Sequence, residues 1–141
     1  RKGVRLRVVL GENVAVAGSA LSFNLNLENP KGALIRRVRA ALVQTVKLDF
    51  SEKTVILVQR PLEKIERIKN KIFNENFQIQ IPHNIPATFS YRFPSKFAKQ
   101  SLAAHYKLTF VVHLRGMFTN IRMELPVLIT NGLPETDDDD E

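Results

Sequence analysis

The chain contains no cysteine among its 141 residues. Disulfides, thiolate nucleophiles and cysteine zinc sites are therefore excluded together, and a cytoplasmic setting fits better than a secreted one. Apolar runs are also short, since none approaches the roughly 20 residues that a membrane-spanning helix needs. The opening five residues, 1–5, lack the apolar core of a secretory signal and begin without methionine, so we expect an excised domain.

Acidic residues are scarce outside the C-terminal end. The net charge is +7, but residues 135–141 hold six of the 14 acidic residues and no basic one. The rest of the chain carries 21 basic residues against 8 acidic ones, a net charge of +13. Such an excess points to an anionic partner, whether phospholipid, phosphorylated peptide or nucleic acid; a solvated basic surface is the alternative. We expect residues 1–133 to form one folded domain and residues 134–141 a disordered acidic tail.

Groups that could perform catalysis are few. The three histidines, His83, His105 and His113, are far apart in the sequence and have no acidic residue at metal-ligand spacing. Neither a G-x-S-x-G element nor a glycine-rich phosphate loop is present. The clustered aspartates of the tail lack the spacing and glycine of an EF-hand loop. We therefore expect a protein that is not an enzyme and that uses neither a metal nor another cofactor.

Most of the chain follows the two-residue period of half-buried strands. Phe77, Ile79 and Ile81 fall on one side of their segment, and Pro82 ends it. Further strands are expected at residues 5–10, 14–16, 21–28, 35–50, 54–59, 106–116 and 121–129. Glycine, proline and asparagine turns separate them, and no long helix is indicated. The pattern predicts an all-β, immunoglobulin-like antiparallel β-sandwich of seven or eight strands.

Some segments are less regular. Residues 61–73 favour an irregular strand, but their apolar spacing also fits a short helix that begins with Pro61. Residues 89–104 are predicted to be a loop. Gln44 interrupts the apolar side of its strand, so it needs a polar partner if it is buried. Pro126 indicates an edge or a bulge, because it cannot donate a backbone hydrogen bond.

Several short stretches resemble one family when taken in order. They are Val16–Leu21 at a turn, Asn29 at a strand end, the basic stretch Arg36–Arg39 leading to Gln44, Ile81-Pro82 to Ile85-Pro86, and Glu124–Ile129, which reads ELPVLI. Their order and spacing over residues 4–133 resemble the C-terminal domain of the arrestin family. The ending and the short loops look most like the α-arrestins, the arrestin-domain trafficking adaptors. Ser19 and Ala87 depart from the family pattern, which usually has glutamate and proline there.

The resemblance implies a non-enzymatic adaptor or scaffold in membrane-protein trafficking or signalling. Its expected partners are the cytoplasmic tails of membrane proteins, the N-terminal arrestin domain of the same chain and anionic phospholipid, including phosphoinositides. A HECT ubiquitin ligase would be recruited through segments outside this chain, which has no PPxY motif. The implied location is cytoplasmic and peripheral, at the plasma membrane or endosomes.

The basic residues supply the candidate site. Arg37, Arg39 and Lys47 share the polar side of one predicted strand, and Lys107 lies on the polar side of another. If these strands are neighbours, the four cations gather on one face and form a candidate site for anionic lipid or phosphate. The resemblance adds that arrestins of the β class carry a phosphoinositide-binding cluster here. Arg39 and Lys107 match two of its positions, whereas two others are Val43 and Thr109.

Two other functions stay open. A sorting-complex subunit of the same fold, similar to the retromer-type arrestin-like subunits, would bind partner proteins through its edges. A nucleic-acid-binding sandwich would use the positive charge of the body. The second is disfavoured, because most of the nine phenylalanines and two tyrosines fall on apolar sides and cannot stack on bases.

Overall fold

The computed structural model describes residues 3–62, 72–93, 100–116 and 120–132. Every regular element in this part of the chain is a strand: β1 (Arg5–Leu10), β2 (Val14–Val16), β3 (Ala20–Glu28), β4 (Ile35–Leu48), β5 (Ser51–Pro61), β6 (Ile72–Gln80), β7 (Phe89–Phe93), β8 (Gln100–Leu114) and β9 (Ile121–Thr130). None of the described residues belongs to a helix long and apolar enough to cross a membrane. The expected tail at 134–141 and most of the ambiguous segment 61–73 lie outside the described residues.

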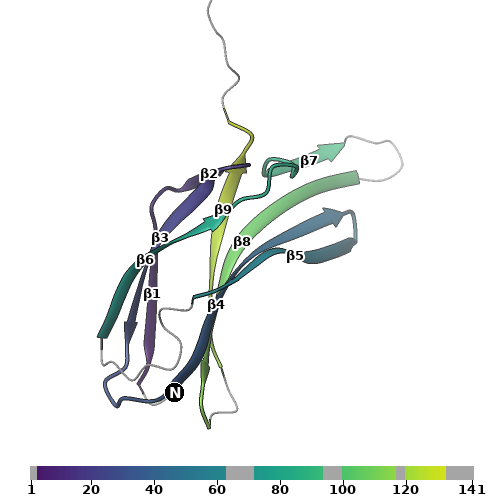
Figure 1. Ribbon diagram of the computed structural model, residues 1–141. Coiled ribbons are helices and arrows are strands. Elements are labelled where there is room, and N and C mark those ends of the chain that lie inside the picture. The colour runs from purple at the N-terminus through teal and green to yellow at the C-terminus, as the bar shows by residue number, and fades with distance from the viewer. Residues whose placement is uncertain (1–2, 63–71, 94–99, 117–119, 133–141) are drawn as a thin grey trace, which may run out of the picture.

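The strands form two sheets, which confirms the predicted all-β sandwich (Figure 1). The small sheet has the order β1-β3-β6. The large sheet has the order β2-β9-β8-β4-β5, and β7 pairs with β8. All pairs are antiparallel except β2 with β9, which is parallel.

Alternate side chains of both sheets meet in one core. The ring of Phe23 stacks on Phe77, with centroids 5.8 Å apart, and meets the edge of Phe110 at 5.2 Å. Leu25 and Leu108 are fully buried beside them. Burial of each such side chain contributes about 1.5–3 kcal/mol, so the period-two pattern largely sets which face of each strand points inward.

The strands β4 and β8 lie side by side and carry the candidate site. Their pairing is continuous from Arg37 with His113 to Leu48 with Leu102. Gln44 is half-buried on the core side, and its Nε2 donates to the Tyr106 hydroxyl at 3.1 Å. The polar partner that Gln44 was predicted to need is therefore present.

The structure corrects two predictions from the sequence. Residues 89–93 form strand β7 rather than a loop, and β8 begins at Gln100 rather than Tyr106, because these segments pair with each other. The strand predicted at residues 35–50 ends earlier, because β4 ends at Leu48 and Phe50 is fully exposed in the following turn. Asp49 adopts a positive φ of 53° in that turn.

The edge position predicted for Pro126 is confirmed. Pro126 lies opposite Lys107 of β8. On its other side β9 pairs with β2 only through Leu128–Thr130, so no described strand covers that edge of β9 at Pro126. The missing N–H of proline therefore costs no hydrogen bond of the sheet.

Candidate anion-binding site

All four cations predicted for the site lie on the outer face of the large sheet, away from the small sheet. Arg37 and Arg39 pair with His113 and Val111, Lys107 pairs with Val43, and Lys47 pairs with Ala103. Residues of both strands at odd positions therefore share one side, because their even neighbours such as Val38, Leu42, Leu108 and Val112 fill the core. The expected neighbourhood of the two strands is confirmed.

These four cations do not form a single cluster. Arg37 and Lys47 are ten residues apart on β4, which corresponds to about 33 Å along a strand. This separation exceeds the Debye length of about 8 Å at physiological ionic strength, so Lys47 is electrostatically separate from Arg37. Between them, Lys107 Nζ lies 3.0 Å from Glu124 Oε2 in an exposed ion pair. Of the predicted residues, the structure brings only Arg37 and Arg39 together.

A residue of β9 completes the group around Arg37 and Arg39. Arg122 lies opposite Val111, which in turn lies opposite Arg39. Neighbouring strands are about 4.8 Å apart, so the Cα atoms of Arg39 and Arg122 are roughly 10 Å apart in one row across the sheet. Arg37 and His113 form the next row. We call Arg37, Arg39, Arg122 and His113 the arginine cluster.

The sequence analysis missed Arg122 and His113 as site residues. The alternation of apolar and polar residues does place Arg122 on the polar side of its strand, because Ile121 and Met123 on either side of it face the core. Its place beside Arg39, however, depends on the register between β8 and β9, which periodicity does not give.

The positively charged side chains of the arginine cluster affect one another. Partial burial, and then the charges of Arg37, Arg39, Arg122 and Arg36, lower the pKa of His113 below its ordinary value of 6.5. Within the described part of the chain, none of Arg37, Arg39 and Arg122 forms an ion pair or a side-chain hydrogen bond. Like charges at neighbouring positions of a sheet destabilise it. A bound anion would relieve this repulsion.

The chemistry of the arginine cluster suits the binding of an anion. Guanidinium groups present planar pairs of donors that fit phosphate or carboxylate oxygens. His113 adds a donor that becomes charged when the imidazole takes up a proton. Among the described residues, no group of three or more histidine, aspartate or glutamate side chains could hold a metal ion.

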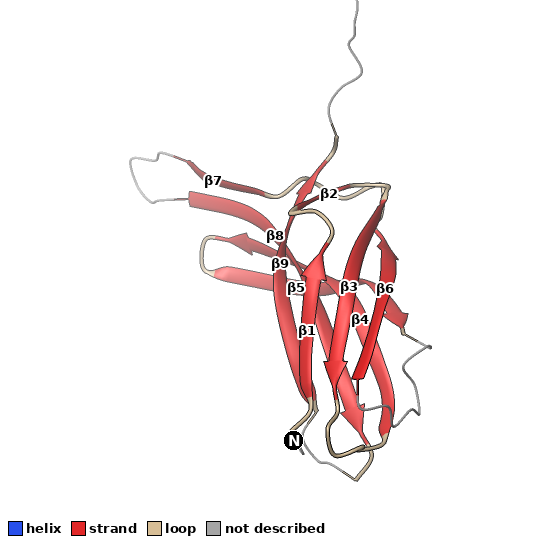
Figure 2. Cartoon of the chain, turned by 90° about the vertical axis from the view of Figure 1, so that its left-hand side faces the viewer, coloured by secondary structure: helices blue, strands red, loops and turns tan. Residues whose placement is uncertain are grey.

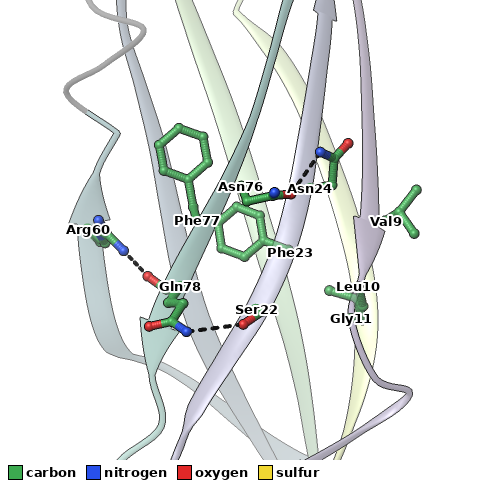
Figure 3. A pocket seen from close by; sticks show the side chains of 10 residues that line it. All are labelled: Val9, Leu10, Gly11, Ser22, Phe23, Asn24, Arg60, Asn76, Phe77 and Gln78. Atoms are coloured by element: carbon green, nitrogen blue, oxygen red, sulfur yellow. Dashed lines mark hydrogen bonds between the residues drawn. The ribbon is translucent and has the colours of Figure 1, made fainter.

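The structure also contains an open hollow of about 630 Å³ over the small sheet (Figure 3). Its polar side chains bind one another. The Asn24 amide donates to Asn76 at 2.9 Å, and the Gln78 amide donates to Ser22 at 3.3 Å. Arg60 donates to the backbone carbonyl of Gln78. Because these polar groups are already hydrogen-bonded, the arginine cluster is the stronger candidate site.

Comparison with known proteins assigns the family. The family model described as arrestin (or S-antigen), C-terminal domain, matches residues 1–132. The chain belongs to the arrestin family. This arrestin C-terminal domain is similar in fold to the crystal structure of Spo0M, a sporulation control protein from Bacillus subtilis, with a TM-score of 0.65 and 11% sequence identity.

The likeness to Spo0M covers 89% of the arrestin C-terminal domain but 49% of Spo0M. The chain therefore spans about half the length of this fold relative. At this level of identity the likeness shows a common fold. A search of curated protein sequences found no match.

Proposed function

We propose that this arrestin domain is a non-enzymatic adaptor whose arginine cluster holds anionic phospholipid while other surfaces bind the cytoplasmic tails of membrane proteins. The observation that carries the proposal is the group of three arginines on the outer face that have no acidic partner among the described residues. Glu124, which follows on the same face of β9, is engaged by Lys107 instead.

The arginine cluster supports a weak membrane contact. A basic residue near an anionic leaflet contributes about 1 kcal/mol, so three contribute roughly 3 kcal/mol. That free energy corresponds to a dissociation constant in the millimolar range. Stable recruitment would therefore need a second contact at the same time, such as a bound cargo tail.

The proposal also includes a branch of the arrestin family, further partners and a location in the cell. The ending ELPVLI supports the α-arrestin branch, with an N-terminal arrestin domain in the same chain and a HECT ubiquitin ligase recruited outside it. The domain would then act in the cytoplasm at the plasma membrane or endosomes. Nucleic-acid binding is less well supported, because the exposed aromatic rings, such as Phe50 and Tyr91, lie at the other end of the large sheet from the arginine cluster.

Co-sedimentation with vesicles tests the lipid proposal. The variant Arg37→Glu/Arg39→Glu/Arg122→Glu should lose binding to phosphatidylcholine vesicles that contain phosphatidylinositol bisphosphate. The matched control is Arg5→Glu/Arg7→Glu/Lys47→Glu, which makes the same change in net charge at exposed positions of β1 and β4. It should retain most of the binding, because these cations lie on the other sheet or at the far end of β4.

Equal loss in the two variants would show that net charge alone drives association, and the arginine cluster would then not be the site. Circular dichroism of both variants confirms that each remains folded.

A further inference from the structure

His113 is the member of the arginine cluster whose charge can change near neutral pH. Its neighbours Val112 and Leu114 are buried in the core, so the His113 side chain lies on the outer face of the large sheet. The small sheet of β1, β3 and β6 packs against the opposite side (Figures 1 and 2). The imidazole is half-buried, so it still contacts solvent and can exchange a proton with water.

The charged groups around His113 are positive in the described part of the chain. They are Arg36, Arg37 and Arg39 of β4, Arg122 of β9, and Arg115, which follows β8. Arg37 lies directly opposite His113. Along the whole of β4, β8 and β9, the only acid on the outer face is Glu124, which lies opposite Thr109, about 13 Å along the sheet from His113. Lys107 already engages Glu124, so an anion beside His113 has to come from outside these strands.

This surrounding couples the proton of His113 to the binding of an anion. Partial burial and the arginines lower the pKa of His113 below 6.5, so the imidazole is neutral in the free domain at neutral pH. An anion on the arginines reduces the positive potential at the imidazole and favours its charged form. Because linkage is reciprocal, the charged form of His113 also binds the anion more tightly than the neutral form does.

We propose that His113 is a specificity-determining residue of the lipid site, which takes up a proton at an anionic membrane surface and so makes binding depend on pH and on the density of anionic lipid. The inference rests on the proposed function, because it assigns a role to a residue of the same arginine cluster. It goes beyond that function, since arginines alone would bind equally well at every pH in this range.

The membrane itself promotes the uptake of the proton. An anionic leaflet carries a surface potential of roughly −30 mV, which concentrates protons at the surface about threefold. A leaflet with more anionic lipid has a stronger potential and concentrates them further. His113 therefore becomes charged more readily on a strongly anionic membrane than on a weakly anionic one, and the site gains a fourth cation there.

The size and sign of the effect follow from one additional charge. A cation close to an anionic leaflet strengthens binding by about fivefold. Above the pKa of His113 in the bound state the imidazole is neutral, and this gain is absent. As the pH falls the gain appears, and it is complete below the lowered pKa of the free state. Affinity should therefore rise as the pH falls through this window.

Co-sedimentation with vesicles of phosphatidylcholine and phosphatidylglycerol tests the proposal at constant ionic strength. Phosphatidylglycerol is a phosphodiester and keeps its charge, whereas the phosphomonoesters of phosphoinositides titrate with a second pKa of about 6. We expect the affinity of the wild type to rise about fivefold when the pH is lowered from about 7.5 to about 5.5, and that of His113→Gln to rise much less. The matched control is His105→Gln, eight residues away on the same face of β8, which should keep the gain of the wild type.

The variant His113→Arg supplies a second test, because its charge is permanent. At the higher pH it should bind as tightly as the wild type does at the lower pH, and lowering the pH should add little. In the wild type, binding at the higher pH should also rise more steeply with the fraction of phosphatidylglycerol than in His113→Arg. Circular dichroism at both pH values confirms that each variant is folded.

Equal gains in the wild type and His113→Gln would overturn the proposal, as would the absence of a gain in the wild type or its loss in His105→Gln. Failure of the lipid site itself is a different result. In that case the variant Arg37→Glu/Arg39→Glu/Arg122→Glu would bind the same vesicles as well as the wild type. If this variant loses binding while the wild type and His113→Gln respond equally to pH, the lipid site stands and only the role of His113 is wrong.

Discussion

Gly18 shows how a single residue fixes the local backbone. Its φ is +88°, and a Cβ atom at this position would lie 2.5 Å from Nδ1 of His83. The N–H of Gly18 donates to the carbonyls of Ile81 and Pro82, at 3.0 and 3.1 Å. The close approach of these segments therefore needs a residue without a side chain.

We expect Gly18→Ala to lower the free energy of unfolding by about 1–3 kcal/mol, because it adds both a clash and an unfavourable φ. Urea unfolding measures the change. Replacing His83 as well, in Gly18→Ala/His83→Ala, should recover the part due to the clash but not the part due to φ. A single variant as stable as the wild type would contradict the role of this contact.

His113 gives the stability of the domain a specific dependence on pH. Burial and the surrounding arginines lower the pKa of His113 in the folded state below the ordinary 6.5. As the pH falls below 6.5, the unfolded state takes up the proton first, so stability is lost between this value and the lowered pKa. Above 6.5 the contribution is fully present.

The wild type should therefore lose more thermal stability than His113→Gln when the pH is lowered from about 7.5 to about 5.5. Calorimetry of both proteins at the two pH values measures the difference. His83 and His105 are present in both proteins, so their contributions cancel. Equal losses would show that burial and the surrounding arginines do not lower the pKa of His113.

At the scale of elements, alternation of apolar and polar residues predicted most strands and the faces they bury. The apolar sides of 77–81 and 121–129 pack as expected, because burial of one face dictates the register of each strand. Strand β7 was missed because its five residues precede Pro94 and pack their aromatic rings outside the core. Arg122 and the Lys107–Glu124 pair could not be found either, since both depend on which strands become neighbours.

The connection between β3 and β4 is held by one buried side chain. Asn29 is fully buried; its Oδ1 accepts from the Ala33 N–H at 3.0 Å, and its Nδ2 donates to the Ala33 carbonyl at 2.7 Å. Without these bonds, two buried backbone groups of Ala33 would lack partners.

Asn29→Ala should destabilise the domain by about 2–4 kcal/mol, because a buried group left unsatisfied costs roughly 1–3 kcal/mol. The matched control is Asn24→Ala, which removes hydrogen bonds only to the exposed amides of Asn74 and Asn76 and should cost well under half as much. Chemical denaturation of both variants compares them. Similar losses would mean that Asn29 does not hold the turn.

At the scale of the whole molecule, the large sheet presents two surfaces that differ in chemistry and direction. The arginine cluster lies on its outer side near the end of β8, and the exposed apolar side chains of Leu48 and Tyr91 lie on its inner side near the start of β8. The proposed lipid contact uses the outer side alone. This arrangement suits an adaptor, which has to join several partners.

The central claim, that the arginine cluster binds an anionic headgroup, is tested most directly by an NMR pH titration of the histidine Cε1 protons with and without soluble inositol bisphosphate. We predict that the pKa of His113 lies below its ordinary value in the free protein and rises when the headgroup is bound. His105, eight residues away on the same face of β8, should not respond. An unchanged His113, or equal shifts of all three histidines, would contradict the account.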